Sequence, residues 1–208
     1  MTIIRRQIAL IFVVLFGLNA CTTLPDGPQQ AVNLPIQLAK LTDVTQWQIK
    51  GKMAIRQGKK AVSANMNWKT NQTDFEFRLT NMLGISLVNM DYTQGLATLE
   101  ADGNHYENTD PSALIYQVTN WDIPVHKLLS WIKGLPLKDD VYQLNDKQLL
   151  ASLSPGCQTC SQWQVTYSQY GNVSGIWLPY QLTLRQTNKD NTMIKIRIET
   201  WDLLDEPR

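Results

Sequence analysis

The chain has 208 residues, of which 43% are hydrophobic and 18% charged, and its formal net charge is +1. This length fits one domain, or two small ones, with a core large enough to fold without a metal or a disulfide. The composition excludes a disordered, collagen-like, coiled-coil or polytopic membrane protein. The near-neutral charge gives no support for a protein that binds nucleic acid.

The first 20 residues read as a signal peptide. Arg5 and Arg6 form a basic start, and an apolar stretch follows from Ile8 to Leu18, too short to span a bilayer. The next residues, Leu18-Asn-Ala-Cys21, resemble the lipobox of bacterial lipoproteins. That resemblance implies cleavage before Cys21 and acylation of its thiol and its new amine. The alternative is an ordinary secretory signal with a chance cysteine.

The expected mature chain begins at Cys21. Removal of residues 1–20 takes away two of the 19 basic residues and none of the 18 acidic ones, which leaves a net charge of −1. This balance gives no polybasic patch for anionic lipid, so attachment to outer-membrane lipid is expected from the acyl chains alone. Thr22 follows the cysteine, where an Asp would favour inner-membrane retention in similar lipoproteins. The resemblance therefore implies the periplasmic face of the outer membrane.

Residues 21–34 are rich in Pro, Gly and Gln and predict a lipidated, flexible tether, followed by one folded domain over residues 35–208. A helical spacing of apolar residues predicts a short helix over residues 36–45. Alternation with a period of two predicts strands at 47–55, 62–68, 75–79, 87–92, 96–100, 105–106, 142–144, 149–153, 163–167, 176–184 and 193–201.

Two short helices interrupt the strands. Asp110 and Pro111 suit the N-cap and first position of one helix, and Val125 to Ile132 forms the other, which ends near Gly134. Ten or eleven strands with an inserted helix pair predict a mainly β (α+β) protein. We expect a strongly curved antiparallel sheet, closed or nearly so, with the helices over one mouth.

Several segments in order resemble the LolB family of outer-membrane lipoprotein receptors. They are Trp47-Gln-Ile-Lys-Gly-Lys-Met-Ala-Ile55, Ser63-Ala-Asn-Met-Asn-Trp68, Leu79-Thr-Asn-Met-Leu-Gly84, Trp121-Asp-Ile-Pro-Val125 and Leu129-Ser-Trp-Ile-Lys-Gly-Leu-Pro136. The resemblance implies a half-closed antiparallel β-barrel with helices as a lid over an apolar cavity. It also implies that the protein takes acylated lipoproteins from the periplasmic carrier LolA and places them in the outer membrane.

Such a task needs an apolar conduit, because exposing the acyl chains of one lipoprotein to water would cost on the order of 30 kcal/mol. The candidate lining residues are apolar side chains of the sheet and of the second helix: Met53, Ile55, Met66, Trp68, Phe75, Phe77, Leu79, Leu128 and Ile132. The alternative for any one of them is a place in an ordinary packed core.

The segment Asn81-Met-Leu-Gly-Ile85 lies between two predicted strands, where polar residues are usual. Met82, Leu83 and Ile85 are large and apolar, which favours an exposed tip that contacts a membrane. Leu83 matches the leucine of the protruding loop of the LolB family. The alternative is that the strands run on through this segment.

No catalytic constellation is found, so an enzyme is not expected, and neither is a metal or another cofactor. Cys157 and Cys160 form the one reactive-looking motif, for which a disulfide in an oxidising periplasm is favoured over free thiols or metal binding. We expect a monomer. The competing function is an envelope scaffold lipoprotein with a packed core.

Overall fold

The computed structural model describes residues 25–121, 123–156, 162–186 and 192–204. Within these ranges, eleven strands form one antiparallel sheet in the order β6-β5-β4-β3-β2-β1-β11-β10-β9-β8-β7. The elements are α2 (Leu34–Asp43), β1 (Gln46–Gln57), β2 (Lys60–Asn71), β3 (Asp74–Thr80), β4 (Ser86–Thr93), β5 (Leu96–Ala101), β6 (Asn104–Asn108), α3 (Pro111–Thr119), α4 (Val125–Trp131), β7 (Val141–Leu144), β8 (Leu150–Ser154), β9 (Trp163–Val173), β10 (Ile176–Gln186) and β11 (Met193–Leu203).

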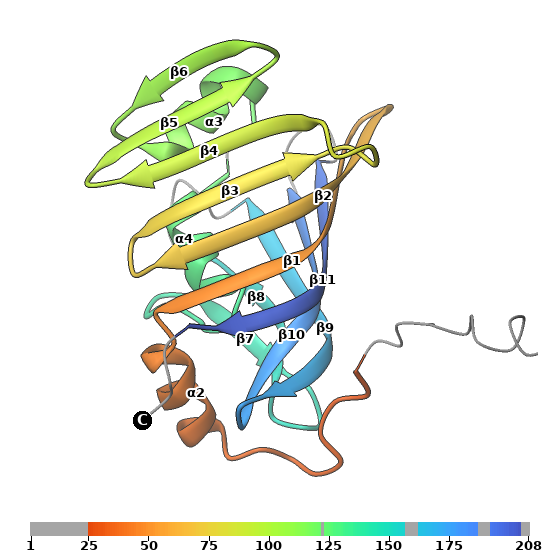
Figure 1. Ribbon diagram of the computed structural model, residues 1–208. Helices are drawn as coiled ribbons and strands as arrows, with labels where there is room; N and C mark the ends of the chain where they lie inside the picture. The colour runs from red at the N-terminus through yellow and green to blue at the C-terminus, as the bar shows by residue number, and fades with distance from the viewer. Residues whose placement is uncertain (1–24, 122, 157–161, 187–191, 205–208) are drawn as a thin grey trace, which may run out of the picture.

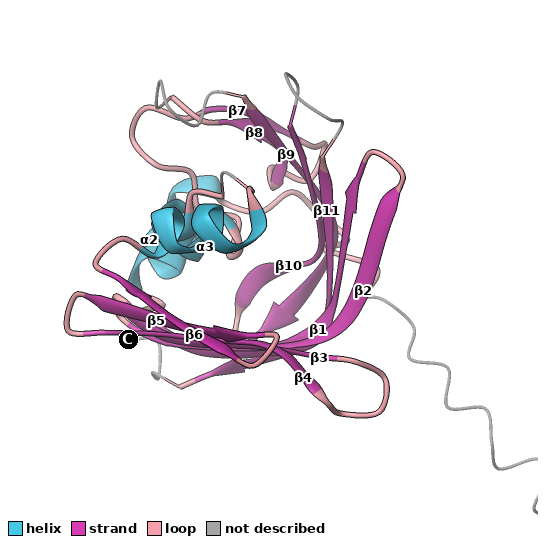
Figure 2. Cartoon of the chain, turned by 90° about the horizontal axis from the view of Figure 1, so that it is seen from above, coloured by secondary structure: helices cyan, strands magenta, loops and turns pink. Residues whose placement is uncertain are grey.

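The sheet consists of two meanders that meet where β1 pairs with β11. Strands β6 and β7 are the two ends of this order, so the sheet is curled but not closed (Figure 2). Helices α3 and α4 lie on its concave side, and α2 lies at one end (Figures 1 and 2). The expected half-closed antiparallel barrel with short helices is therefore confirmed.

Alternation of buried and exposed residues along the long strands β1, β2 and β11 places one face of the sheet in the core. In β1, Trp47, Ile49, Met53 and Ile55 are buried, whereas the lysines between them are exposed. This period-two pattern is the reason that the strands follow from the sequence. The buried set extends through both meanders and continues into the helices as one core.

A β-bulge at Gly51 bends the seam between the two meanders. The pairing of β1 with β11 shifts register between Lys50 and Gly51. A Cβ atom at Gly51 would lie 2.1 Å from the carbonyl oxygen of Arg197, so only glycine permits this close approach. Because a bulge increases local twist, it favours the curl that the sheet needs to enclose a cavity.

Helix α2 covers one end of the curled sheet. Asn33 caps it by accepting a hydrogen bond from the backbone N–H of Ile36, and Pro35 suits its first turn. The helix therefore begins two residues before the predicted start. Buried Gln37 exchanges two hydrogen bonds with the backbone of Trp177 in β10. These bonds fix α2 against that end of the sheet.

Lys133 joins the end of α2 to the segment after α4. Its side chain is buried, and its Nζ donates hydrogen bonds to the carbonyl oxygens of Leu41, at 2.8 Å, and Val44, at 2.5 Å. Burial lowers the pKa of Lys133 to about 8. The cation satisfies carbonyls that the end of a helix leaves unpaired.

None of the helices in the described ranges is long and apolar enough to cross a membrane.

Candidate functional site

The concave face of the sheet and the α3–α4 segment enclose an apolar cavity of about 360 Å³. Strands β1 to β5 and Ile194 of β11 form one wall. The other wall consists of Ile115, Val118, Thr119, Trp121, Ile123, Val125 and Leu128. Its lining is almost entirely aliphatic, aromatic or thioether side chains, with Thr119 and Asp102 as the polar exceptions. Such a lining suits a long apolar ligand with no specific polar groups.

Seven of the nine predicted lining residues line this cavity. They are Met53, Ile55, Trp68, Phe75, Phe77, Leu79 and Leu128. The other two, Met66 and Ile132, are not among its lining residues and are almost fully buried in the core. Both side chains lie on the inner side of the fold, but an inward position can lead to the packed core as well as to the cavity.

Aromatic side chains make the sheet wall rigid. The indole ring of Trp68 packs edge-on against the rings of Phe77, at a centroid distance of 5.4 Å, and Trp47, at 5.5 Å. Phe75 stacks on Tyr92 at 5.6 Å. Edge-on and stacked pairs of this kind fix ring orientations. The wall therefore keeps its shape while the smaller aliphatic residues opposite it can adapt.

Sequence reasoning missed the lining residues of β4, β5 and α3. Val88, Met90 and Leu99 lie at inward positions of β4 and β5, and Ile115 and Val118 lie on one face of α3. The alternation in these strands and the apolar face of the helix could have identified them. Their contact with the cavity depends on where the helices rest, which no local pattern predicts.

The α3–α4 segment forms a lid with one hydrogen bond between its two helices and one to the sheet. Ser112 accepts a hydrogen bond at its Oγ from the backbone N–H of Val125, which joins the two helices. The indole N–H of Trp121 donates to Oε1 of Gln57, at 3.1 Å, at the β1–β2 turn. Trp121 also lines the cavity. Buried apolar residues of both helices, among them Leu114 and Leu128, pack against the core as well, so the lid is held by apolar packing together with these two hydrogen bonds.

We call the edge of the sheet that carries the β1–β2 turn (57–60), the β3–β4 loop (81–85) and the β5–β6 turn (102–103) the mouth edge. The cavity reaches this edge, because Val62, Leu79 and Asp102 line it and lie at the corresponding ends of their strands. Val62 is 54% exposed. The cavity therefore opens at the mouth edge, away from α2.

The β3–β4 loop projects from the mouth edge (Figure 2). Strand β3 ends at Thr80 and β4 begins at Ser86, so the strands do not run on through the segment. Met82, Leu83 and Ile85 are 93%, 85% and 60% exposed. We call these three side chains the apolar tip.

Asn81 organises the loop that carries the apolar tip. Its Oδ1 accepts hydrogen bonds from the backbone N–H groups of Leu83, at 2.9 Å, and Ile85, at 3.0 Å. Gly84 has φ +80, a conformation that glycine adopts without strain. The Asn81 side chain and the backbone therefore hold the loop in place, and its exposed apolar side chains contribute little to folding.

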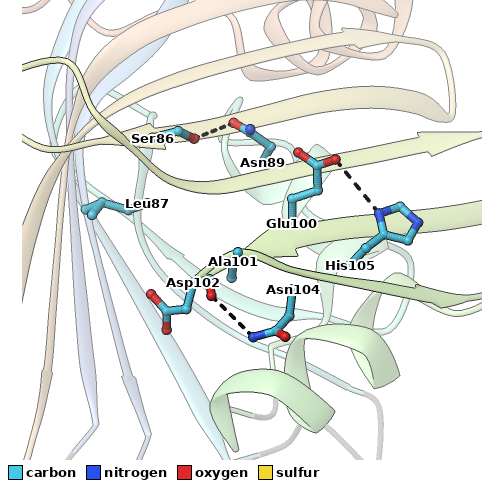
Figure 3. A pocket seen from close by; sticks show the side chains of 9 residues that line it. Ser86, Leu87, Asn89, Glu100, Ala101, Asp102, Asn104 and His105 are labelled. Atoms are coloured by element: carbon cyan, nitrogen blue, oxygen red, sulfur yellow. Dashed lines mark hydrogen bonds and ion pairs between the residues drawn. The ribbon is translucent and has the colours of Figure 1, made fainter.

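A polar pocket of about 300 Å³ lies beside this loop, over β4, β5 and β6 (Figure 3). Ser86 donates to Asn89 at 2.8 Å, and Nδ1 of His105 lies 3.9 Å from Oε1 of Glu100. Asp102 lines both this pocket and the apolar cavity. The mouth edge is thus polar and acidic on the β4–β6 side of the apolar tip.

Three predicted site residues, Cys21, Cys157 and Cys160, lie outside the described residues. Among the residues that the structure does describe, no three His, Cys, Asp or Glu side chains are placed to hold a metal ion together. The apolar lining of the cavity suits the sequestration of apolar groups.

Comparison with known proteins identifies the relatives of this chain. A family model described as "Outer membrane lipoprotein LolB" matches residues 45–201. The outer-membrane lipoprotein LolB of Aeromonas salmonicida is 36% identical over 193 residues, 92% of this chain and 94% of that protein. The protein of the same name from Aeromonas hydrophila subsp. hydrophila is 34% identical over 204 residues, 98% of this chain and 99% of that protein.

Two solved structures share the fold. A LolA superfamily protein from Nitrosomonas europaea has a TM-score of 0.50 at 11% identity and covers 84% of this chain and 95% of its own. A DUF1329 family protein from Desulfovibrio piger has a TM-score of 0.51 at 10% identity and covers 82% of this chain and 90% of its own. At such identities the likeness shows the fold alone.

Proposed function

The chain belongs to the LolB family of outer-membrane lipoproteins, and we propose that it binds the acyl chains of lipoproteins in its apolar cavity and passes them to the outer membrane. LolB is a receptor for lipoprotein localisation and not an enzyme. The observation that carries the proposal is the apolar cavity of about 360 Å³ that opens at the mouth edge.

The size of the cavity sets the scale of binding. At about 30 Å³ for each methylene-sized group, it holds on the order of ten methylenes. Burial of that many groups stabilises a bound chain by roughly 10 kcal/mol, at ~0.8 kcal/mol for each methylene. A lipoprotein has several acyl chains, so the whole cargo requires more space than this state offers. Outward movement of the α3–α4 lid would supply it.

The apolar tip provides a route out of the cavity. Met82, Leu83 and Ile85 would enter the bilayer interface, where apolar side chains gain free energy by leaving water. The tip lies on the edge where the cavity opens, so an acyl chain that leaves the mouth meets lipid directly. Delivery of this kind needs no nucleotide, because the bilayer binds the chains more strongly than the cavity does.

The anchor and the partners complete the proposal. Residues 1–20 would be removed as a signal peptide, Cys21 would carry the acyl anchor, and residues 21–34 would join it to the domain of residues 35–208. Cargo would arrive from a carrier of the LolA type, received by a monomer of this chain. Cys157 and Cys160 would form a local disulfide.

A transfer assay tests the function. An acylated lipoprotein, loaded on a LolA carrier, is mixed with the chain from residue 21 carrying Cys21→Ala, which lacks the acyl anchor. We expect the cargo to co-purify with this chain without detergent or nucleotide. Retention of the cargo on a carrier that can transfer it to another receptor would contradict the proposal and favour a scaffold role.

A further inference from the structure

Four basic side chains gather on the mouth edge at the side of the apolar tip opposite to the polar pocket. This cluster, which we call the basic corner, consists of Arg56, Lys59, Lys60 and Arg185. All four are exposed, and none forms an ion pair within the described part of the chain. Unpaired cations at one corner indicate an anionic partner.

Strand pairing brings the two arginines together from distant parts of the sequence. Arg56 of β1 and Arg185 of β10 are both register partners of Met193 in β11. Their Cα atoms are thus two strand spacings apart, about 10 Å. A pocket of about 330 Å³ lies between them on the outer face, lined by both arginines, Gly58 and Met193. Two guanidinium groups that face one pocket suit a phosphate, which each can bind through two parallel hydrogen bonds.

The position of the basic corner beside the apolar tip favours a membrane lipid, rather than free phosphate, as the source of that phosphate. Strand β3, which leads into the apolar tip, is two strands from β1, again about 10 Å. Apolar groups in the bilayer with cations at headgroup level form the usual interfacial arrangement. The acidic side of the mouth edge, with Glu100 and Asp102, would be repelled by an anionic surface. The two sides together define one orientation on a membrane.

We propose that the basic corner binds the phosphates of anionic membrane lipids while the apolar tip is inserted, so that the cavity mouth faces the bilayer. This inference rests on the proposed function of the apolar tip. It differs from the sequence-based expectation that the acyl chains alone attach the protein. Three of the four basic residues belong to the β1–β2 hairpin, and the fold brings the fourth, Arg185 of β10, beside them.

Vesicle binding tests the proposal. The chain from residue 21 with Cys21→Ala is compared with the same chain carrying Arg56→Gln and Arg185→Gln. The vesicles contain phosphatidylethanolamine with either phosphatidylglycerol or phosphatidylcholine. Loss of both arginines should weaken binding to the phosphatidylglycerol vesicles by about 25-fold at low salt, or about five-fold for each residue. The loss should vanish at high salt and on the phosphatidylcholine vesicles.

A matched control removes the same charge elsewhere. Lys50 and Lys69 are exposed on β1 and β2, and Lys50 is six residues from Arg56, or about 20 Å along the strand and two Debye lengths in ordinary buffer. The pair Lys50→Gln and Lys69→Gln should therefore change binding much less. Equal losses in the two pairs would overturn the proposal, as would unchanged binding of the arginine pair. Competition by millimolar inorganic phosphate at constant ionic strength would also overturn it, since it would indicate a site for free phosphate.

Carrier-to-chain transfer without vesicles separates this inference from the proposed function. Both double variants should accept cargo as the unsubstituted Cys21→Ala chain does, because neither changes the cavity. Failure of that chain to accept cargo would contradict the proposed function and leave the vesicle comparison interpretable. Loss of acceptance in the arginine pair alone would overturn the present proposal, because it would place the basic corner at the carrier.

Discussion

Leu83→Glu should abolish delivery to membranes while it leaves folding and cargo acceptance intact. Leu83 is 85% exposed and the loop is held by the backbone and by Asn81, so the free energy of unfolding should change by less than about 0.5 kcal/mol. Membrane entry of a leucine is worth about 1.5–3 kcal/mol, and a carboxylate is disfavoured there by a further ~2.5 kcal/mol or more. The sum exceeds about 4 kcal/mol, which predicts a loss of delivery of at least roughly a thousand-fold.

The assay follows labelled cargo from the loaded protein into liposomes, with carrier-to-protein transfer measured separately. The matched control is Ile36→Glu, since Ile36 is also an exposed apolar residue, at 55%, but lies in α2 away from the mouth edge. Ile36→Glu should deliver normally. Delivery by Leu83→Glu at the unsubstituted rate would refute the reasoning, as would an equal defect in the control.

Three further predictions concern the framework around the site. Gly51→Ala should destabilise the fold by at least about 2 kcal/mol in urea titrations, because its Cβ would collide with the carbonyl of Arg197; near-normal stability would contradict this account of the bulge. Asn81→Ala should speed hydrogen exchange at the amides of Leu83 and Ile85 and cost at most about 1 kcal/mol globally; unchanged exchange would argue against its role. Between pH 8 and 9 stability should rise by up to about 1.4 kcal/mol per pH unit, because Lys133 titrates near 8 when folded and near 10.5 when unfolded, so that the unfolded chain binds more protons; Lys133→Met should remove this slope. Towards pH 10 the rise should end, because burial raises the pKa of Tyr167 and Tyr170 and these tyrosines lose protons only in the unfolded chain.

The long strands β1, β2 and β11 were predictable because buried and exposed residues alternate along them. In β2, Met66, Trp68 and Thr70 are buried, and the residues between them are exposed. This alternation can be read from the sequence without knowledge of which strands are its neighbours. The cap of α3 was predictable for a similar reason, since Asp110 accepts a hydrogen bond from the N–H of Ser112 as an N-cap residue should. Local chemistry determines both features.

The division between cavity and core was not predictable in the same way. Met66 and Phe77 both belong to the inner side of the sheet, yet only Phe77 lines the cavity. The difference depends on where the α3–α4 segment rests, which is a long-range property. The sequence likewise did not predict that Arg56 and Arg185 lie on either side of Met193, because this depends on the order of the strands in the sheet.

Photo-cross-linking tests most directly whether the acyl chains lie in the cavity. A photoreactive phenylalanine analogue replaces Phe77, which lines the cavity, or Lys69, which is exposed on the outer face of the same sheet. The chain is loaded with cargo whose acyl groups carry a label and is then illuminated. We predict labelled product from position 77 and none from position 69. Absence of label at position 77 in a variant that still accepts cargo would contradict binding in the cavity.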